Sequence, residues 1–316
     1  MRIGYFLASE EFTPAELVAQ AQAAERAGFE ALWISDHYHP WNDAQGQSAF
    51  VWLAIGAISQ VCRLPITTAV TCPTVRLHPA VVAQAAATSA VLCEGRFVLG
   101  VGSGEALNEH IFGDPWPTAD VRLEMLDEAV EVIRKLWSGE FVNHRGRHYT
   151  VDQARIYTLP DQPPPIYVSG FGPKAVELAA RIGDGYIITG PAAELVKEFR
   201  DSGGGDKPVQ GGFKACYAAD EAEAVQIAYE RWPNSGLPGE LAQVLPSPRH
   251  FEQATELVRP EMIREKFVCG PDPEPHLQKI DEYASAGFDE VYVANTGPNA
   301  DGFFRLYAEQ VLPRLR

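Results

Sequence analysis

The feature that most constrains the fold of this chain is a repeated alternation of short apolar segments with longer helix-like segments. Each apolar segment is rich in the β-branched and aromatic residues that favour strands, and turn residues flank it. We expect eight strands, at Ile3–Leu7, Ala31–Ile34, Pro65–Val70, Phe97–Val101, Ile166–Ser169, Gly185–Ile188, Phe213–Tyr217 and Glu290–Ala294. Eight strand–helix pairs over 316 residues favour a (β/α)8 barrel, with a doubly wound open sheet as the alternative.

Helix boundary signals support this alternation. Thr13 precedes Pro14 and has Glu16 three residues later, the pattern of a capping box, and Gly28 marks the end, so a helix is predicted over Pro14–Ala27. The last helix is expected over Phe303–Leu315. We expect residues 1–316 to form one domain, interrupted by an irregular insertion at about 233–266.

Composition excludes several classes of function. The net charge is −16 and no basic stripe occurs, which argues against a nucleic-acid partner. No apolar run approaches the ~18 residues of a membrane span. The five cysteines are scattered without a CxxC pair, and no HExxH motif or Cys/His cluster predicts a metal site. We therefore expect a cytoplasmic protein that binds small molecules.

Ionisable residues follow several of the predicted strands. Asp36, His37 and Trp41 follow the second strand, Glu10 follows the first, and Glu105 follows the fourth. The C-terminal ends of parallel strands meet at one rim, so these side chains are expected to converge there. Hydride transfer coupled to proton transfer needs such a set, because one group must take a hydroxyl proton and another must balance charge on the acceptor ring.

Two glycine-rich turns also lie at predicted strand ends. The segment Gly100–Gly104 lacks the complete GxGxxG pattern of a dinucleotide site and would instead let the backbone approach a ring. The segment Ser169–Lys174 precedes a helix, whose free amides could hold a phosphate. An ordinary strand-to-helix turn explains this second segment equally well.

A set of motifs extends over nearly the whole chain. It comprises Ser35-Asp36-His37 with Pro40-Trp41, Thr71–Arg76, Pro79–Gln84, Leu99–Glu109 and Gly183–Tyr186. With these motifs the chain resembles the luciferase-like flavin and deazaflavin oxidoreductases. Within them it is most similar to the coenzyme F420-dependent glucose-6-phosphate dehydrogenase group.

The resemblance implies a barrel that holds F420 at its C-terminal rim, in a protein that forms a homodimer. It implies that His37 takes the substrate proton, that Glu105 serves the proton at ring N1, that Trp41 packs on the reacting centre, and that Glu10 is a further active-site acid. It also implies a cis peptide between Ala69 and Val70. The positions that match cofactor-binding residues are Asp36, Ala69, Val70, Thr71, Gly104, Asn108, Ser169, Gly170, Gly172 and Thr189.

The sequence departs from that group where the group binds phosphate. No lysine follows the sixth strand, and Glu265 stands where a lysine is expected, which leaves Arg264 and Lys266 as candidate substrate-binding residues. The substrate is therefore expected to be a sugar phosphate or another alcohol. Two other functions remain open: an FMN-dependent monooxygenase and a non-catalytic cofactor-binding protein. The second is disfavoured because binding alone needs no base such as His37.

Overall fold

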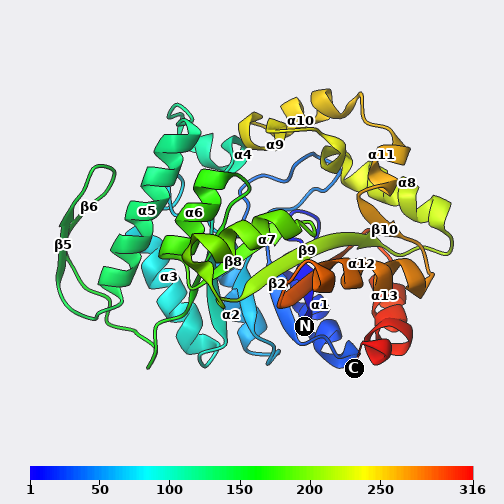
Figure 1. The fold of residues 1–316 in the computed structure, drawn as a ribbon, viewed down its shortest axis with the longest axis horizontal. Helices are drawn as coiled ribbons and strands as arrows, with labels where there is room; N and C mark the ends of the chain where they lie inside the picture. The colour runs from blue at the N-terminus through cyan, green and yellow to red at the C-terminus, as the bar shows by residue number, and fades with distance from the viewer. Residues whose placement is uncertain (316) are drawn as a thin grey trace.

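The computed structural model describes residues 1–315, and its centre is a closed barrel of eight parallel strands (Figure 1). In spatial order the barrel strands are β1 (Arg2–Leu7), β2 (Ala31–Ile34), β3 (Ile66–Thr68), β4 (Phe97–Val101), β7 (Ile166–Ser169), β8 (Gly185–Thr189), β9 (Val209–Cys216) and β11 (Glu290–Thr296). Pairing of β9 with both β8 and β11 closes the sheet. The barrel prediction is therefore confirmed, and the open-sheet alternative is wrong.

Helices surround this barrel, as expected for strands buried on both faces. They are α1 (Pro14–Ala27), α2 (Val51–Ser59), α3 (Pro79–Leu92), α5 (Ala119–Leu136), α6 (Pro173–Ile182), α7 (Ala193–Phe199), α8 (Glu221–Arg231), α12 (Pro273–Ser285) and α13 (Ala300–Leu306). The capping box of Thr13 and Glu16 forms, and α1 ends at Gly28 in a left-handed conformation, as predicted. None of the helices in residues 1–315 is long and apolar enough to cross a membrane.

The last helix is shorter than predicted. The α-helical hydrogen bonding ends at Leu306, and a π turn and a 3-10 turn continue to Arg314. Pro313 lies in that final turn and has no amide hydrogen to donate to a helical ladder.

Large side chains fill the barrel interior below its C-terminal rim. The rings of Trp33 and Tyr292 stack with centroids 4.4 Å apart, and Trp33 Nε1 donates to Gln210 Oε1 at 2.8 Å. Gly212 allows this packing, because a Cβ there would lie 2.5 Å from the Trp33 ring. The interior is closed at this level, so ligands have access only to the side chains above it.

The insertion after α8 is more ordered than the sequence indicated. It contains α9 (Leu241–Val244), α10 (Pro248–Thr255) and α11 (Pro260–Arg264), and it returns as the short strand β10 (Phe267–Cys269). These helices are too short to show a clear helical period. Figure 1 shows α9 and α10 at the edge of the molecule, joined through α11 to β10.

Strand β10 extends the barrel wall on one side. It pairs with β9 at Lys214–Cys216, whereas β8 pairs with β9 at Val209–Gly212. Strand β10 therefore takes the place beside β9 that β8 leaves after Gly212. Away from the barrel, β5 (Val142–Arg145) and β6 (Thr150–Ala154) form a separate antiparallel hairpin.

Candidate active site

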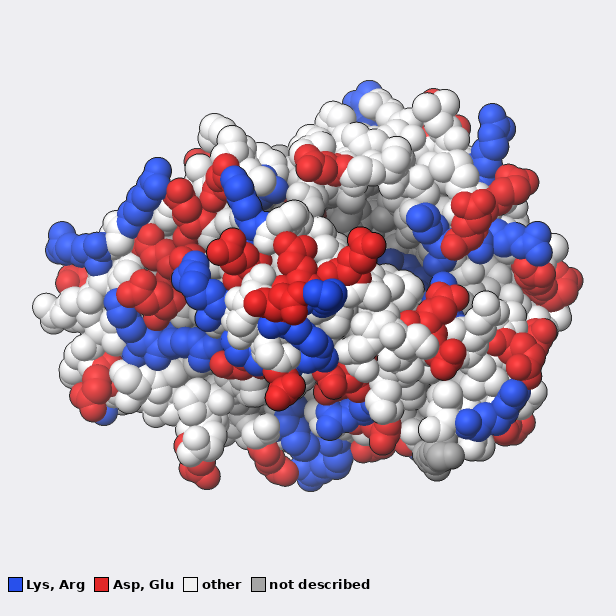
Figure 2. All heavy atoms as spheres, in the orientation of Figure 1, with Lys and Arg blue, Asp and Glu red and all other residues white. Residues whose placement is uncertain are grey.

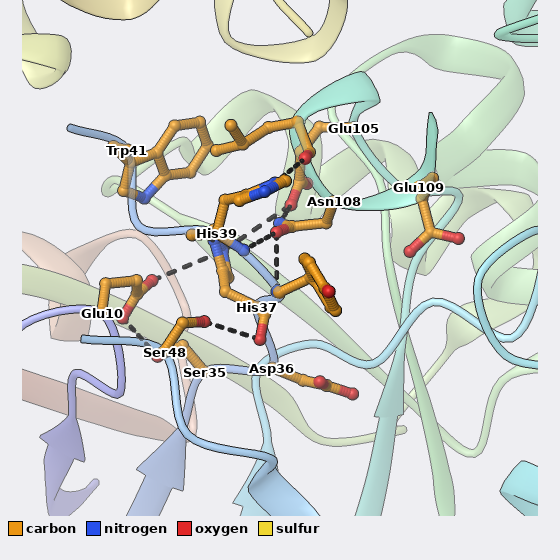
Figure 3. Close-up of polar contacts among 12 residues, drawn as sticks. Glu10, Ser35, Asp36, His37, His39, Trp41, Ser48, Glu105, Asn108 and Glu109 are labelled. Atoms are coloured by element: carbon orange, nitrogen blue, oxygen red, sulfur yellow. Dashed lines mark hydrogen bonds and ion pairs between the residues drawn. The ribbon is translucent and has the colours of Figure 1, made fainter. Parts of the chain in front are cut away.

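The His37 imidazole lies between two carboxylates at the C-terminal rim (Figure 3). Its Nε2 is 3.4 Å from Glu10 Oε1 and 3.6 Å from Glu105 Oε1. The three side chains come from the loops after β2, β1 and β4, and Figure 3 shows the two acids approaching the ring from different sides. The structure thus brings together three of the four residues predicted to be catalytic. We refer to Glu10, His37 and Glu105 as the His37 cluster.

The hydrogen bond at the other ring nitrogen defines the tautomer of neutral His37. Nδ1 lies 3.2 Å from the backbone oxygen of His39, which can only accept a hydrogen bond. In the tautomer that donates to this oxygen, Nε2 carries the lone pair of the neutral ring. In that tautomer the basic nitrogen is on the side that faces Glu10 and Glu105.

Trp41, the fourth predicted catalytic residue, packs beside this imidazole. The ring centroids of His37 and Trp41 are 5.0 Å apart. Trp41 also packs edge to face against Phe251 of α10, with ring centroids 5.1 Å apart. Trp41 therefore links the His37 cluster to the insertion and covers it with apolar surface.

Each acid of the cluster is held by a neighbouring polar side chain. Ser35 Oγ donates to Glu10 Oε2 at 2.6 Å, and Glu10 is almost fully buried. Asn108 Nδ2 donates to Glu105 Oε1 at 2.5 Å, while Asn108 Oδ1 accepts from the amides of Tyr38 and His39. Asn108 was predicted to bind the cofactor, and in this structure it also fixes Glu105 relative to the loop after β2.

Asp36 points away from the His37 ring and anchors a buried ionic network (Figure 3). It accepts from Thr71 Oγ1 at 2.7 Å and from Arg76 Nη2 at 2.8 Å. Arg76 Nε lies 3.5 Å from Glu109 Oε1, and burial raises the pKa of Glu109 to about 7. Burial acts to lower the pKa of the Arg76 guanidinium. The nearby carboxylates of Asp36 and Glu109 outweigh this effect, so the pKa is raised. Asp36 and Thr71, two of the residues expected to contact the cofactor, are therefore joined by a hydrogen bond.

The ring-binding region predicted from the resemblance has the expected backbone. The peptide between Ala69 and Val70 is cis, as the resemblance implied. Val70 packs closely on the glycine-rich turn after β4, since a Cβ on Gly102 would lie 2.8 Å from Val70 Cγ2. Gly104 has a φ of +86°, which a residue with a side chain rarely adopts. The glycines after β4 therefore let this turn pack closely against Val70 and, at Gly104, against Glu109 and Trp116.

The glycine-rich turn after β7, where a phosphate was predicted, leads into α6. Gly172 is the N-cap of α6 with no side-chain cap, and a Cβ on it would meet no atom within 4 Å. Tyr186 Oη holds the turn by donating to the oxygen of Gly170 at 2.6 Å. The first amides of α6 are thus open to an anion. Ser169 and Thr189 end the two adjacent strands β7 and β8, whereas Lys174 turns away to pair with Asp120 at 2.7 Å.

The structure does not bring the candidate substrate residue Arg264 to the His37 cluster. Its Nη2 lies 2.7 Å from Glu221 Oε1, and both side chains are exposed. The residue lines a surface pocket beside β10 and α12, and no residue of the His37 cluster belongs to that pocket. Lys266 is exposed and makes no described ion pair. Residues 260–264 form the helix α11, which no sequence pattern indicated, and this helix determines where Arg264 points.

Lys214, which was not predicted from the sequence as a site residue, faces the barrel mouth from β9. It follows the inward-facing Gln210 and Gly212 at strand spacing, and its Nζ lies 4.5 Å from the ring centroid of Trp232. Burial lowers the pKa of Lys214, and the charge of Glu10 opposes that shift. The alternation along β9 is the signal that would have identified it, but the predicted strand began only at Phe213.

A second missed residue, Glu11, positions Trp232. Glu11 Oε2 accepts from Trp232 Nε1 at 2.8 Å, and Oε1 accepts from the amide of Gly297 at 2.6 Å. Burial raises the pKa of Glu11, although both hydrogen bonds act to lower it. The carboxyl group joins the end of β1 to the end of α8 and to the turn after β11.

Comparison with known proteins identifies the family. Residues 1–290 match the family model of luciferase-like monooxygenases, and the chain belongs to this family. It is 36% identical to an F420-dependent glucose-6-phosphate dehydrogenase of Beutenbergia cavernae and 37% identical to one of Microbacterium testaceum, in both cases over 100% of this chain and 98% of the relative.

Solved structures give the same family and fold. An F420-dependent secondary alcohol dehydrogenase in complex with an F420–acetone adduct superimposes with a TM-score of 0.90 at 33% identity, over 100% of this chain and 99% of the other. The F420-dependent tetrahydromethanopterin reductase of Methanopyrus kandleri has a TM-score of 0.79 at 21% identity, over 100% of this chain and 99% of the other, and shares the fold.

Proposed function

We propose that this protein is a coenzyme F420-dependent dehydrogenase that oxidises a hydroxyl group of an alcohol or a sugar phosphate to a carbonyl. The observation that carries the proposal is the His37 imidazole, whose free Nε2 faces the rim between Glu10 and Glu105. The relatives named above support the cofactor and the reaction type, because they are F420-dependent dehydrogenases of glucose 6-phosphate and of secondary alcohols.

The cofactor-binding residues fit F420. Ala69, Val70, Gly102 and Gly104 would lie against its ring, and the open first turn of α6 would hold its phosphate. When bound, F420 supplies an acceptor for hydride at C5. The relatives favour F420 over FMN, the alternative for this family.

The residues of the His37 cluster would manage the proton of the reaction. His37 Nε2 would take the proton from the substrate hydroxyl oxygen while hydride leaves the carbon that bears this oxygen, so the alcohol becomes a carbonyl compound and the imidazole becomes protonated. Glu10 and Glu105 then stabilise the imidazolium through their charges. Trp41 excludes water from this step and strengthens those charge interactions. A protein that only binds a cofactor has no need of this arrangement.

Spectroscopy with purified components tests the proposal. The protein is mixed with F420 and either 2-propanol or glucose 6-phosphate, and the absorbance of oxidised F420 is followed. We expect that absorbance to fall with at least one of the two substrates, and FMN in place of F420 to give no turnover. Reduction of FMN but not of F420 would favour the monooxygenase alternative. Binding of F420 without turnover on any alcohol would favour the non-catalytic one.

We also propose that the protein is a homodimer that associates through α2 and α3. Neither the nine residues of α2 nor the fourteen of α3 include a charged side chain, whereas α5 carries acidic and basic residues along its length. Leu53 on α2 is 75% exposed and Val81 on α3 is 52% exposed. An apolar surface of this kind is typical of an interface between copies of one chain.

Light scattering after gel filtration tests the homodimer. The wild-type chain is expected at twice the monomer mass, and Leu53→Glu is expected to shift it to the monomer. Leu257→Glu is the matched control, because Leu257 is 84% exposed in the insertion, away from both helices. A monomeric wild type, or dissociation by both variants alike, would contradict the proposed interface.

A cytoplasmic location is the remaining proposal. All five cysteines are free in the structure, as expected for a chain in a reducing compartment. Fractionation of the source cells should recover the protein with cytoplasmic markers, and recovery from the medium or the membrane pellet would contradict this.

A further inference from the structure

We propose that Ser35 is a positioning residue of the reaction: its hydroxyl holds Glu10 so that one carboxylate oxygen stays directed at His37 Nε2. Ser35 keeps its own proton throughout and acts only through Glu10. This inference rests on the proposed function and adds to it a residue that determines the rate of the same step.

The two oxygens of the Glu10 carboxylate have different neighbours (Figure 3). Oε2 accepts from Ser35 Oγ at 2.6 Å, whereas Oε1 lies 3.4 Å from His37 Nε2. Among residues 1–315, Ser35 is the only described donor of a hydrogen bond to this carboxylate. The last torsion of a glutamate side chain is otherwise broadly distributed. The bond to Oε2 therefore decides where Oε1 points.

The Ser35 hydroxyl is itself fixed by the ends of the first two barrel strands. The Ser35 amide donates to the oxygen of Leu7 at 3.3 Å, which continues the pairing of β1 with β2. Ser35 Oγ accepts from the amide of Ser9 at 2.9 Å, and Ser9 directly precedes Glu10. Ser9 and Ser35 are both buried. The hydroxyl thus joins the backbone before Glu10 to the carboxylate of Glu10.

The single proton of the Ser35 hydroxyl is directed to Glu10. The other oxygens near Ser35 Oγ are Ser9 Oγ at 2.9 Å and the Leu7 carbonyl oxygen at 3.5 Å, so Glu10 Oε2 is the nearest acceptor. A separation of 2.6 Å is typical of a hydroxyl that donates to an ionised carboxylate. Ser9 Oγ has an acceptor of its own in the Ser35 carbonyl oxygen at 2.8 Å.

Glu105, the second acid of the His37 cluster, is held differently. Its Oε1 accepts from Asn108 and also lies 3.6 Å from His37 Nε2, and its side chain is 24% exposed, compared with 3% for Glu10. Charges interact more strongly away from water. The position of Glu10 is therefore expected to affect a charge on His37 more than the position of Glu105 does.

The proposed reaction creates that charge, because His37 becomes an imidazolium when it takes the substrate proton. Glu10 Oε1 stabilises the imidazolium from 3.4 Å, and a carboxylate that turns away stabilises it less. A group fixed in the productive geometry before the reaction avoids this loss. Ser35 should therefore affect kcat rather than the binding of either ligand.

Steady-state kinetics of serine variants test the inference. F420 is used with 2-propanol or glucose 6-phosphate, whichever the wild type oxidises. Ser35→Ala is expected to lower kcat by about tenfold to a hundredfold, the range for one hydrogen bond to a charged group, with little change in KM or in the affinity for F420. Ser9→Ala should lower kcat less, because the Ser9 amide still holds Ser35. Ser59→Ala is the matched control, since it removes a buried hydroxyl that donates to a backbone oxygen in α2, and kcat should not change.

A double-mutant cycle separates positioning from a general effect on the fold. In a Glu10→Gln background there is no charge to direct, so Ser35→Ala should lower kcat by less than about twofold more. The same factor in both backgrounds would overturn the inference, as would an unchanged kcat in Ser35→Ala or a loss confined to F420 affinity. If Ser35→Ala does not fold, Ser9→Ala takes its place in the cycle under the same criteria.

A measurement without turnover keeps this inference distinct from the proposed function. If the wild type reduces F420 with no alcohol, the proposed function fails, and ¹⁵N NMR of the histidines then decides on Ser35. The Nε2 chemical shift of His37, assigned with His37→Ala, should move in Ser35→Ala in the same direction as in Glu10→Gln and stay unchanged in Ser59→Ala. A wild-type chemical shift in Ser35→Ala would refute the positioning role.

Discussion

The two halves of the barrel mouth are built in different ways. On the side of β1, β2 and β4, the polar groups of Glu10, His37 and Glu105 are paired with one another or with Ser35 and Asn108. On the side of β9 and the insertion, the ammonium of Lys214 contacts the ring face of Trp232 and has no hydrogen-bond acceptor among residues 1–315. Figure 2 shows a hollow in one face of the molecule. The polar groups of the first half are therefore satisfied by one another, whereas the second half leaves an ammonium without a hydrogen-bond acceptor among residues 1–315.

The largest effect is expected from removing the base in the first half. His37→Ala should lower kcat by about a hundredfold to ten-thousandfold, because proton transfer to a positioned base contributes about that much. The affinity for F420, measured by its fluorescence, should change little. A kcat within tenfold of the wild type would show that another group is the base. Proton transfer would then no longer distinguish the first half of the mouth from the second.

The next largest effect concerns stability, in the buried network behind the first half. The pKa of Glu109 is raised by burial from 4.5 to about 7, so its contribution to stability is present below pH 4.5 and is lost as the pH rises through 7. That loss amounts to roughly 3 kcal/mol. Glu109→Gln cannot ionise, so its free energy of unfolding relative to the wild type should rise between pH 5 and pH 8. Urea unfolding at both pH values measures this, and a constant difference would contradict it.

A smaller loss of stability is expected at Glu11, whose carboxylate joins the end of β1 to Trp232 in the second half of the mouth. Glu11→Gln keeps one acceptor oxygen but leaves either Trp232 Nε1 or the Gly297 amide unpaired. The free energy of unfolding should fall by about 1–3 kcal/mol. Glu256→Gln, on the surface of the insertion, is the control and should leave that free energy unchanged. Urea unfolding measures both variants, and equal stabilities would show that Trp232 does not depend on Glu11.

The smallest effect is expected at Arg264. Arg264→Ala should leave kcat/KM within about twofold for both 2-propanol and glucose 6-phosphate, because an exposed ion pair contributes little. A tenfold rise in KM for glucose 6-phosphate alone would instead restore the substrate role predicted from the sequence. The second half of the mouth would then extend as far as α11.

The same contrast explains what could be predicted from the sequence. The strands Ala31–Ile34 and Phe97–Val101 form as predicted, and Asp36, His37 and Glu105 follow them within a few residues, so local pattern was sufficient to locate the His37 cluster. Strand β9 was predicted only from Phe213, because it begins with Val209-Gln210-Gly211-Gly212 and glycine is rare in strands. Those glycines fit because Tyr283 and Trp33 pack against them, and such distant contacts cannot be read from local sequence. The direction of Lys214 and the helices of the insertion were missed for the same reason.

Strand β9 has a consequence for how this protein can change. The segment between β9 and β10 leaves from the end of β9 and returns to pair with the same strand at Lys214–Cys216. Its two ends are therefore fixed side by side, whatever lies between them. The segment can therefore change in length or sequence without moving Glu10, His37 and Glu105, which follow β1, β2 and β4.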